Sequence, residues 1–253
     1  SLNRRILLQR VAQTTAAGAA LAVAQANAAP DTRPSPTNAP PPSMPTKKDA
    51  MNTSFTKPLS RETTVLLITD HQVGLYTGVR DITVAELKHN IVALAKAVRL
   101  LGVPVVMTGT MTDGMWGPII PELRAALPDV TPIIRTTINA WDDPRVVEAV
   151  KKTGRHQLLV AGISLEICAA LPAIAAKQAG YDTRVMLDAS GTFNDAKRTA
   201  GIQRLTGAGV PLMDHAGAAV ELLHDNADPK ANAVYGALDM AFATLVWQVT
   251  QKG

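Results

Sequence analysis

The sequence of 253 residues contains one cysteine, and aromatic residues make up 4% of it. A single cysteine excludes an intrachain disulfide framework and a zinc site built from clustered cysteines. No run of 18 uninterrupted apolar residues occurs, so we expect no membrane span. Hydrophobic residues nevertheless form 47% of the chain. That content exceeds what a disordered protein carries, and a chain of this length can bury a sizeable core.

The positive charge of the chain is confined to its N-terminal part. The formal net charge is +4, and residues 1–57 hold 7 basic and 2 acidic side chains. Residues 58–253 hold the remaining 18 basic and 19 acidic side chains, a net charge of −1. A nucleic-acid-binding domain carries its basic residues on the folded part, so we expect no nucleic-acid partner.

The first 29 residues follow the plan of an export signal. Arg4 and Arg5 precede a weakly apolar run over 16–24, and residues 26–28 read Ala-Asn-Ala, as at a cleavage site. The paired arginines are typical of a twin-arginine signal, which predicts a periplasmic or otherwise exported protein. A basic tail or an amphipathic helix on a membrane surface is the alternative, with a cytoplasmic location. Residues 30–57 include seven prolines between 30 and 46 and predict an extended linker.

From residue 63 onward, short apolar runs alternate with helical patterns. Strands are predicted over 65–69, 103–108, 132–135, 157–162, 183–187 and 210–213, and helices over 84–101, 118–127, 144–152, 165–179 and 195–207. Continuous apolar runs such as 65–68 are typical of strands covered on both faces. The alternation predicts a three-layer α/β/α sandwich with a mainly parallel six-stranded sheet. The main folded domain would span 58–225 and a C-terminal helical extension 226–253.

Three polar residues fall at or near the carboxyl ends of predicted strands. Asp70 follows the first strand, Arg135 ends the third, and Cys168 comes after the fourth, at the start of a helix. Ligands bind at this edge of a parallel sheet, and a helix start favours a thiolate. An isolated cysteine is more often a small buried hydrophobic residue. Together, however, an acid, a cation and a thiol can form a nucleophilic site.

Four segments then resemble one known family in the same order along the chain: 67–72 (LITDHQ), 138–142 (INAWD), 161–168 (AGISLEIC) and 187–194 (LDASGTFN). The family is that of the isochorismatase-like hydrolases, and the resemblance is greatest to its YcaC-like branch. It extends from about residue 63 to residue 217. The resemblance implies the isochorismatase-like α/β fold.

The resemblance also implies a cysteine-hydrolase triad. Asp70 would be the general base, Cys168 the nucleophile, and Arg135 would stand where nicotinamidase-type members have lysine. A cis peptide would join Ile163 to Ser164, and the backbone N–H groups of Ser164 and Cys168 would form the oxyanion hole. Such a site would hydrolyse a small amide or related acyl substrate through a thioester.

The sequence departs from the family pattern at two points. Segment 110–118 contains Asp113 but no histidine, so we expect no catalytic metal, no cofactor, and not nicotinamide as substrate. Isochorismatase proper lacks the cysteine and cleaves a vinyl ether, so isochorismate is not expected as substrate either. Arginine keeps its charge in proteins, so Arg135 can stabilise an anion but cannot shuttle a proton. Asn139 and Trp141 follow Arg135 closely and are candidate substrate-binding residues, with packing as the alternative for Trp141.

Two other functions compete with the cysteine hydrolase. Gly162-Ile163-Ser164 begins a serine-hydrolase motif, with Asp188 and His215 following in the matching order, but Glu166 stands where that motif needs a small residue. A binding or redox-responsive protein on the same fold is the non-enzymatic alternative. Family members often assemble into rings or stacked octamers, so a homo-oligomer is expected. One apolar helical face from Tyr235 to Val249 would pack on its own domain or on a neighbouring subunit.

Overall fold

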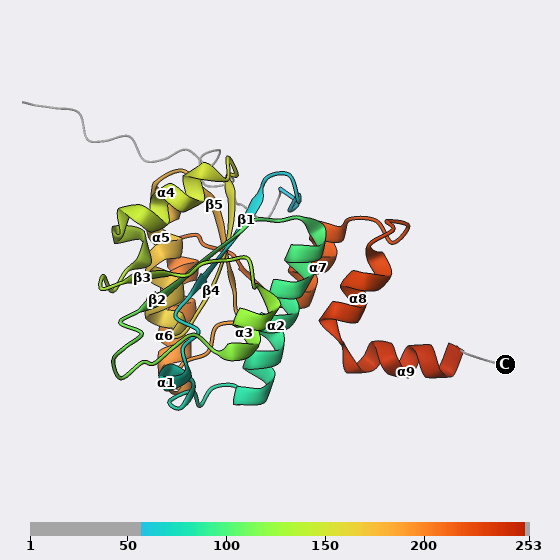
Figure 1. Cartoon of the computed structure of the whole chain (residues 1–253), viewed down its shortest axis with the longest axis horizontal. Coiled ribbons are helices and arrows are strands. Elements are labelled where there is room, and N and C mark those ends of the chain that lie inside the picture. Colours follow the sequence, from blue (N-terminus) through green and yellow to red (C-terminus); the bar gives the residue numbers. More distant parts are fainter. Residues whose placement is uncertain (1–56, 251–253) are drawn as a thin grey trace, which may run out of the picture. The chain divides into compact units, whose positions relative to one another are not determined.

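A sheet of six parallel strands lies at the centre of the fold (Figure 1). The computed structural model describes residues 57–250, so the expected signal segment and all of the linker except Lys57 lie outside the described residues. The sheet order is β3-β2-β1-β4-β5-β6, and every neighbouring pair is parallel. The six-stranded α/β fold is thereby confirmed. The strands are β1 (Thr64–Thr69), β2 (Val105–Thr110), β3 (Ile133–Arg135), β4 (Gln157–Gly162), β5 (Asp182–Met186) and β6 (Leu212–Met213).

Helices cover both faces of this sheet and enclose two separate cores. Leu66 and Ile68 of β1 point into one core, and Val65 and Leu67 point into the other, as the alternation of side chains along a strand requires. Within residues 57–250, none of the helices combines the length and hydropathy that crossing a membrane demands. The first core packs under α2 (Val84–Leu101), α3 (Pro121–Ala126), α7 (His215–Leu223) and α8 (Ala231–Leu238), and the second under α4 (Pro144–Lys152), α5 (Ala170–Gln178) and α6 (Asp195–Gly207).

Local signals explain the elements that the sequence predicts well. All six residues of β1 are buried, which matches its unbroken apolar run. Helix α2 begins after Thr83, whose hydroxyl accepts a hydrogen bond from the N–H of Glu86 at 3.2 Å. It ends at Gly102, where a left-handed φ of 75° suits glycine. The bounds of α2, α4, α6 and β4 agree with the sequence prediction.

The helix predicted over 165–179 consists of two parts. Leu165–Ala169 forms a π-helical turn, and α5 continues from Ala170 to Gln178. Such π-turns are rare in proteins overall, and those that occur are often at functional sites. The sequence pattern also missed the short helix α1 (Val73–Tyr76) and the whole of α7. Of the five buried residues of α7, two are alanines and one is a histidine, so the helix offers few large apolar side chains as a sequence signal.

The C-terminal segment forms two helices instead of one. Helix α8 ends at Leu238, the next residue, Asp239, has a left-handed φ of 45°, and α9 spans Ala241–Thr250. The prediction of one apolar helical face from Tyr235 to Val249 is therefore wrong. Leu238 is fully buried, whereas four apolar side chains of α9 are more than half exposed: Phe242, Leu245, Val246 and Val249. The domain boundary expected at residues 225 and 226 stays a prediction.

The strand register sets where the polar residues meet. Thr69, the last residue of β1, pairs with Thr108 of β2 and with Gly162, the last residue of β4. The residues that follow, Asp70 and Ile163, therefore leave the sheet side by side at its carboxyl edge. A topological switch point lies here, because the chain proceeds from β1 outward in both directions.

Candidate active site

Asp70 occupies the first position beyond β1, with a left-handed φ of 57°. Aspartate tolerates this conformation better than most residues do. Its N–H donates to the carbonyl oxygen of Thr108 at 2.9 Å, which holds the residue over the neighbouring strand. The side chain is 1% exposed. Unusual backbone geometry at a buried carboxylate is typical of a functional position.

Arg135 reaches this carboxylate from β3, two strands away. Its Nη2 lies 2.5 Å from Oδ2 of Asp70, and the arginine side chain is 0% exposed. Nη1 donates to the carbonyl oxygens of Thr137 and, at 3.2 Å, of Ile138. The guanidinium is therefore held by one carboxylate and two backbone groups, in a place that solvent does not reach.

Cys168 lies in the π-helical turn that follows β4. The hydroxyl of Thr69 donates to the carbonyl oxygen of Cys168 at 2.8 Å, which ties the turn to the end of β1. The contact leaves no room for a side chain at Gly162, where a Cβ atom would lie 2.0 Å from Oγ1 of Thr69. The glycine thus allows β1 and the cysteine turn to approach closely.

Burial and the neighbouring carboxylate keep the Cys168 thiol protonated. Desolvation raises its pKa well above the usual value, and the negative charge of Asp70 raises it further. Arg135 and the backbone N–H of Ser164 act in the opposite direction, but more weakly. A thiolate stabilised by a helix start was the expectation from sequence. That expectation is wrong for the site without substrate, because the dominant influence on the thiol is loss of water.

The Asp70 carboxyl group contacts both the Cys168 thiol and Arg135. Burial raises its pKa, while Arg135 and the side chain of Cys168 lower it. Arginine cannot lose its proton, so a neutral Asp70 would leave the buried guanidinium charge of Arg135 uncompensated. The carboxylate form is thus the partner that the arginine requires, and it lies beside a neutral thiol whose proton it can take.

Ser164 stands between β4 and the thiol. The peptide bond from Ile163 to Ser164 is cis, as the resemblance implied. The Ser164 N–H interacts with the Cys168 sulfur, so one of the two proposed oxyanion donors is directed toward the nucleophile.

The serine-hydrolase alternative is not assembled in the fold. Nδ1 of His215 lies 2.6 Å from Oδ2 of Asp188, so these two residues do pair. However, no hydrogen bond among residues 57–250 joins Ser164 to His215, whose ring instead packs edge-on against His89 at 6.2 Å. A serine nucleophile therefore has no base here.

Asn139 and Trp141 make contacts that organise the chain locally. The Asn139 side chain accepts from the Trp141 N–H at 3.0 Å and begins a short 3-10 helix, Ala140–Asp142. The Trp141 ring packs against Tyr181 with 5.3 Å between ring centroids. Their part in substrate binding stays a prediction.

Two residues next to Asp70 shape the site and were not singled out from the sequence. The Gln72 amide donates to the carbonyl oxygens of Thr110 and Gly117 at 2.9 and 2.6 Å and accepts from the Thr110 N–H at 2.8 Å, so it fastens the connection after β2. His71 is fully buried against the Tyr76 hydroxyl, and burial lowers its pKa to about 3. Both lie within the segment LITDHQ, but their partners become visible only in the fold.

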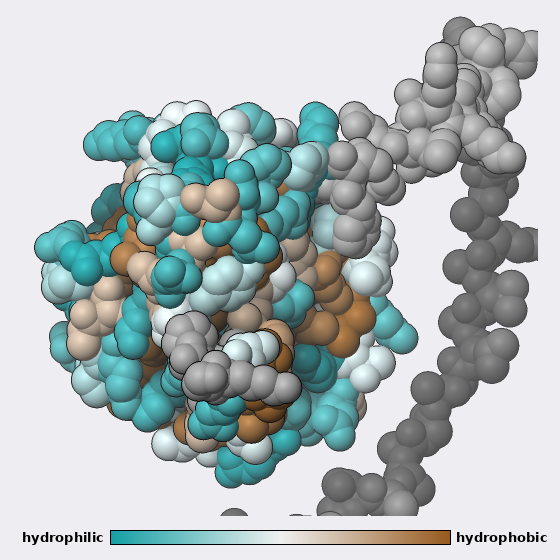
Figure 2. All heavy atoms as spheres, turned by 90° about the vertical axis from the view of Figure 1, so that its right-hand side faces the viewer, coloured by the Kyte–Doolittle hydropathy of each residue, from teal (hydrophilic) through white to brown (hydrophobic). Residues whose placement is uncertain are grey.

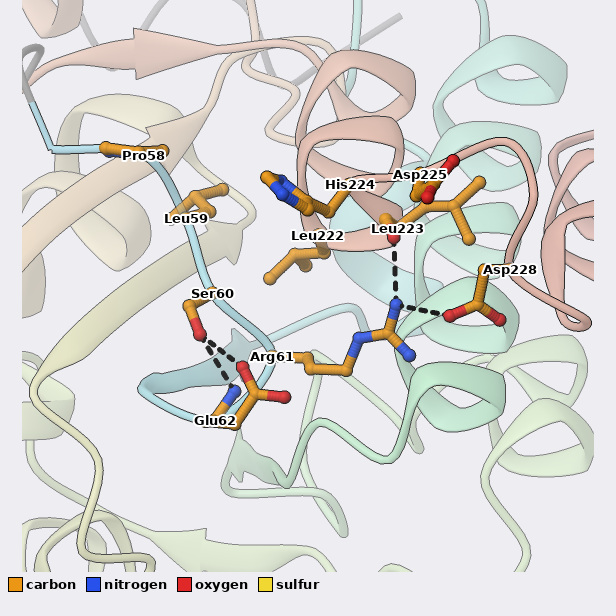
Figure 3. Close-up of a pocket in the computed structure, with 10 residues that line it drawn as sticks. All are labelled: Pro58, Leu59, Ser60, Arg61, Glu62, Leu222, Leu223, His224, Asp225 and Asp228. Carbon is orange, nitrogen blue, oxygen red and sulfur yellow. Dashed lines mark hydrogen bonds and ion pairs between the residues drawn. The ribbon is translucent and has the colours of Figure 1, made fainter.

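A hollow elsewhere on the surface is a poorer candidate. It has a volume of about 450 Å³ and is lined by residues 58–62, 222–225 and Asp228 (Figure 3). It adjoins the amino end of β1, opposite the edge where parallel sheets bind ligands. Arg61 points across it and is held by Asp228 at 2.9 Å and by the Leu223 carbonyl oxygen at 2.8 Å. This hollow is lined by His224 and by acidic side chains but by no thiol, and we assign the chemistry to the other edge.

No three histidine, cysteine, aspartate or glutamate side chains gather within residues 57–250 in a way that could hold a metal ion. The expectation of a metal-free reaction stays a prediction, because a cluster of that kind is only one way to bind a metal.

Comparison with known proteins identifies the family that this chain resembles. The isochorismatase domain model matches residues 64–217. The probable hydrolase YcaC of Escherichia coli (strain K12) is 42% identical over 175 residues, which cover 68% of this chain and 84% of that protein.

Solved structures of two relatives also superpose on this chain. YcaC from Pseudomonas aeruginosa, solved with hexane-2,5-diol and covalent acrylamide, has 39% identity and a TM-score of 0.72, with 76% of this chain and 97% of that chain covered. YcaC from E. coli, described as an octameric hydrolase of unknown specificity, has 37% identity and a TM-score of 0.72, with 76% and 96% covered.

Proposed function

Because this chain belongs to the isochorismatase family, in its YcaC-like branch, and is a hydrolase of that family, we propose that it hydrolyses a small amide or related acyl compound through a thioester on Cys168. The observation that carries the proposal is a contact of three residues, in which the buried Asp70 lies against the thiol of the partly exposed Cys168 and is paired with the buried Arg135 at 2.5 Å. A base, a nucleophile and a fixed counter-charge are the parts that such a reaction needs.

The first half of the reaction forms the acyl-enzyme. Asp70 takes the thiol proton as the sulfur bonds to the acyl carbon, and the carbonyl oxygen becomes an oxyanion held by the N–H groups of Ser164 and Cys168. The carbon–nitrogen bond then breaks, and the carboxyl group of Asp70 gives its proton to the departing nitrogen. The products of this half are a thioester and a free amine or ammonia.

The second half releases the acid. A water molecule attacks the thioester carbon while Asp70 takes one of its protons, and the same N–H groups hold the second oxyanion. The carbon–sulfur bond breaks, and the leaving sulfur takes the proton back from Asp70. Arg135 keeps its charge throughout and holds the Asp70 carboxylate in place, so it acts as a positioning residue.

The structure of the P. aeruginosa relative supports a reactive nucleophile. Acrylamide is an electrophile that adds to thiols, and that relative was solved with covalent acrylamide. Cys168 is the single cysteine of this chain, so the same reagent has one thiol to modify.

The test is a screen of aliphatic and aromatic amides for release of ammonia or amine, combined with intact-mass detection of an acyl adduct. We expect turnover by the wild-type chain, loss of at least ~10³-fold in kcat/KM for Cys168→Ala, and an adduct of one acyl group. Ser164→Ala is the matched control, because it removes a hydroxyl but keeps the backbone N–H. Full activity in Cys168→Ala would refute the cysteine mechanism. Neither turnover nor adduct across the panel would favour a binding role.

We further propose that the chain forms a homo-oligomer through α9. Its four exposed apolar side chains, Phe242, Leu245, Val246 and Val249, are 55–74% exposed. Figure 2 views the molecule from the side that carries α9 and shows patches of hydrophobic surface among hydrophilic residues on that face. The E. coli relative is octameric. Multi-angle light scattering should give a mass several times that of the 26.7 kDa chain. Leu245→Glu should lower it, Gln248→Glu should leave it unchanged, and a monomeric wild type would contradict the proposal.

A further inference from the structure

Five exposed apolar side chains lie on the segments that follow β1, β2, β3 and β4 at the catalytic edge of the sheet. We call this set the apolar rim: Val73, Met111, Met115, Ile138 and Ile167, which are 38%, 56%, 80%, 71% and 37% exposed. With the exposed face of α9, the rim accounts for nine of the 13 large hydrophobic side chains that are exposed among the described residues. Such clustering marks a surface that binds something apolar.

Backbone contacts tie the rim to the catalytic residues. The Met111 N–H donates to the carbonyl oxygen of Arg135 at 3.1 Å, and Arg135 in turn donates to the carbonyl oxygen of Ile138 at 3.2 Å. Ile167 precedes Cys168 in the π-helical turn. The rim thus borders the site along the segments that follow β2, β3 and β4.

The Val73 N–H donates to the carbonyl oxygen of Pro118 at 3.0 Å, and Gly117 packs against the Val73 side chain. Met115 lies in the same connection, and its carbonyl oxygen approaches Gly74 closely. The segment between Met111 and Pro118 is therefore folded back onto the start of α1. The connection after β1 thus borders the site as well.

The segments at this edge carry more acidic than basic side chains. Just beyond them, Arg145 of α4 pairs with Asp143 at 2.7 Å. Segments 70–77, 111–120, 136–143 and 163–169 contain no lysine or arginine, and they contain five acids: Asp70, Asp113, Asp142, Asp143 and Glu166. Arg135, at the end of β3, is 0% exposed and already paired. Lys197, which approaches from α6, lies 3.9 Å from Glu166 and is balanced by it.

An anionic substrate would meet this arrangement unfavourably. Its carboxylate would lose water beside Asp70 and, after proton transfer, beside a thiolate. The neighbouring cations Arg135, Arg145 and Lys197 are each already paired with an acid, so they compensate the lost hydration poorly. An uncharged acyl chain would instead bury its surface against the methionine and isoleucine side chains of the rim. Resting on the proposed function, we infer that the substrate is an uncharged amide with a short apolar acyl chain, and that the rim and its acids reject amides carrying a carboxylate.

The first test measures the site without needing turnover. Iodoacetamide and iodoacetate differ mainly in charge, and both alkylate thiols. The ratio of their second-order rates at Cys168, divided by the same ratio for glutathione, isolates the contribution of the protein. We expect a preference of at least 10-fold for iodoacetamide at low ionic strength, shrinking as salt is added. A ratio equal to that of glutathione would overturn the inference.

The second test places a cation in the rim. Ile138→Lys should bring the preference close to the glutathione value, whereas Ile138→Gln, which is polar but uncharged, should keep most of it. Equal effects of the two substitutions would overturn the role of charge.

Substrate pairs separate this inference from the proposed function. Hexanamide should be hydrolysed at least 10-fold faster, in kcat/KM, than the monoamide of adipic acid. Equal hydrolysis of both would refute the rim's selectivity and leave the cysteine mechanism standing. Hydrolysis of neither, with the alkylation preference intact, would refute the proposed function and leave the selectivity standing.

Discussion

The pairing of Asp70 with Arg135 provides the most quantitative prediction. Both side chains are sealed from solvent, with 1% and 0% exposure, and 2.5 Å separates the paired atoms. Arg135→Met keeps most of the side-chain volume but leaves a buried carboxylate without its counter-charge. Removing one partner of a buried ion pair typically costs about 3–5 kcal/mol. That cost corresponds to roughly a 10²- to 10⁴-fold change in the unfolding equilibrium.

The assay is urea denaturation at pH 7, followed by far-UV circular dichroism, for the wild type, Arg135→Met, Asp70→Asn and the double variant. Each single variant should lose about 3–5 kcal/mol in its free energy of unfolding, because each leaves one buried charge. The double variant buries no net charge and should recover at least about half of the summed losses. Losses below about 1 kcal/mol, or strict additivity in the double variant, would refute the reasoning.

The same variant has a kinetic consequence whose sign follows from the site. Arg135 lowers the pKa of Asp70, so its removal raises that pKa and leaves less of the base form at a given pH. The acidic limb of the profile of kcat/KM against pH should therefore move to higher pH in Arg135→Met. Arg135→Lys keeps the charge but cannot reproduce the bonds to Thr137 and Ile138, so a smaller shift is expected. An unmoved acidic limb in Arg135→Met would contradict the assignment of Asp70 as base.

Three other predictions follow from particular contacts or motifs. Asp70 raises the pKa of the Cys168 thiol, so Asp70→Asn should shift the pH profile of iodoacetamide alkylation downward, and an upward shift would contradict the pairing. At Gly162 a Cβ would lie 2.0 Å from Thr69 Oγ1, whereas a Cβ at Gly207 would have no described atom within 4 Å apart from its chain neighbours and the adjacent backbone of its own helix. Thermal melting should accordingly show Gly162→Ala destabilised by more than about 3 kcal/mol and Gly207→Ala near neutral. Replacing both Arg4 and Arg5 by lysine should abolish the export we propose, as measured by periplasmic fractionation in a host with twin-arginine transport, and unchanged export would exclude that route.

Local patterns determined much of the fold. The apolar run of β1, the Thr83 cap and Gly102 end of α2, and Pro144 at the start of α4 are signals contained in a few neighbouring residues. These signals predict the elements correctly because hydrophobic periodicity, capping and the restrictions of proline act over a single turn or strand. The placement of Asp70, Arg135 and Cys168 at or near strand ends could likewise be predicted, since Asp70 follows β1, Arg135 ends β3 and Cys168 lies in the turn after β4.

The tertiary structure alone decided what these residues do to one another. The Asp70–Arg135 bond joins positions 65 apart in the chain, and it forms because β3, β2 and β1 lie in register. The thiol pKa moves upward, against the expectation from the helix start, because desolvation depends on everything packed around Cys168. The split of α8 from α9 at Asp239 was also hidden, since one left-handed residue interrupts a periodicity that the sequence carries through without a break. Burial, register and long-range charge are properties of the assembled chain, so no local pattern can specify them.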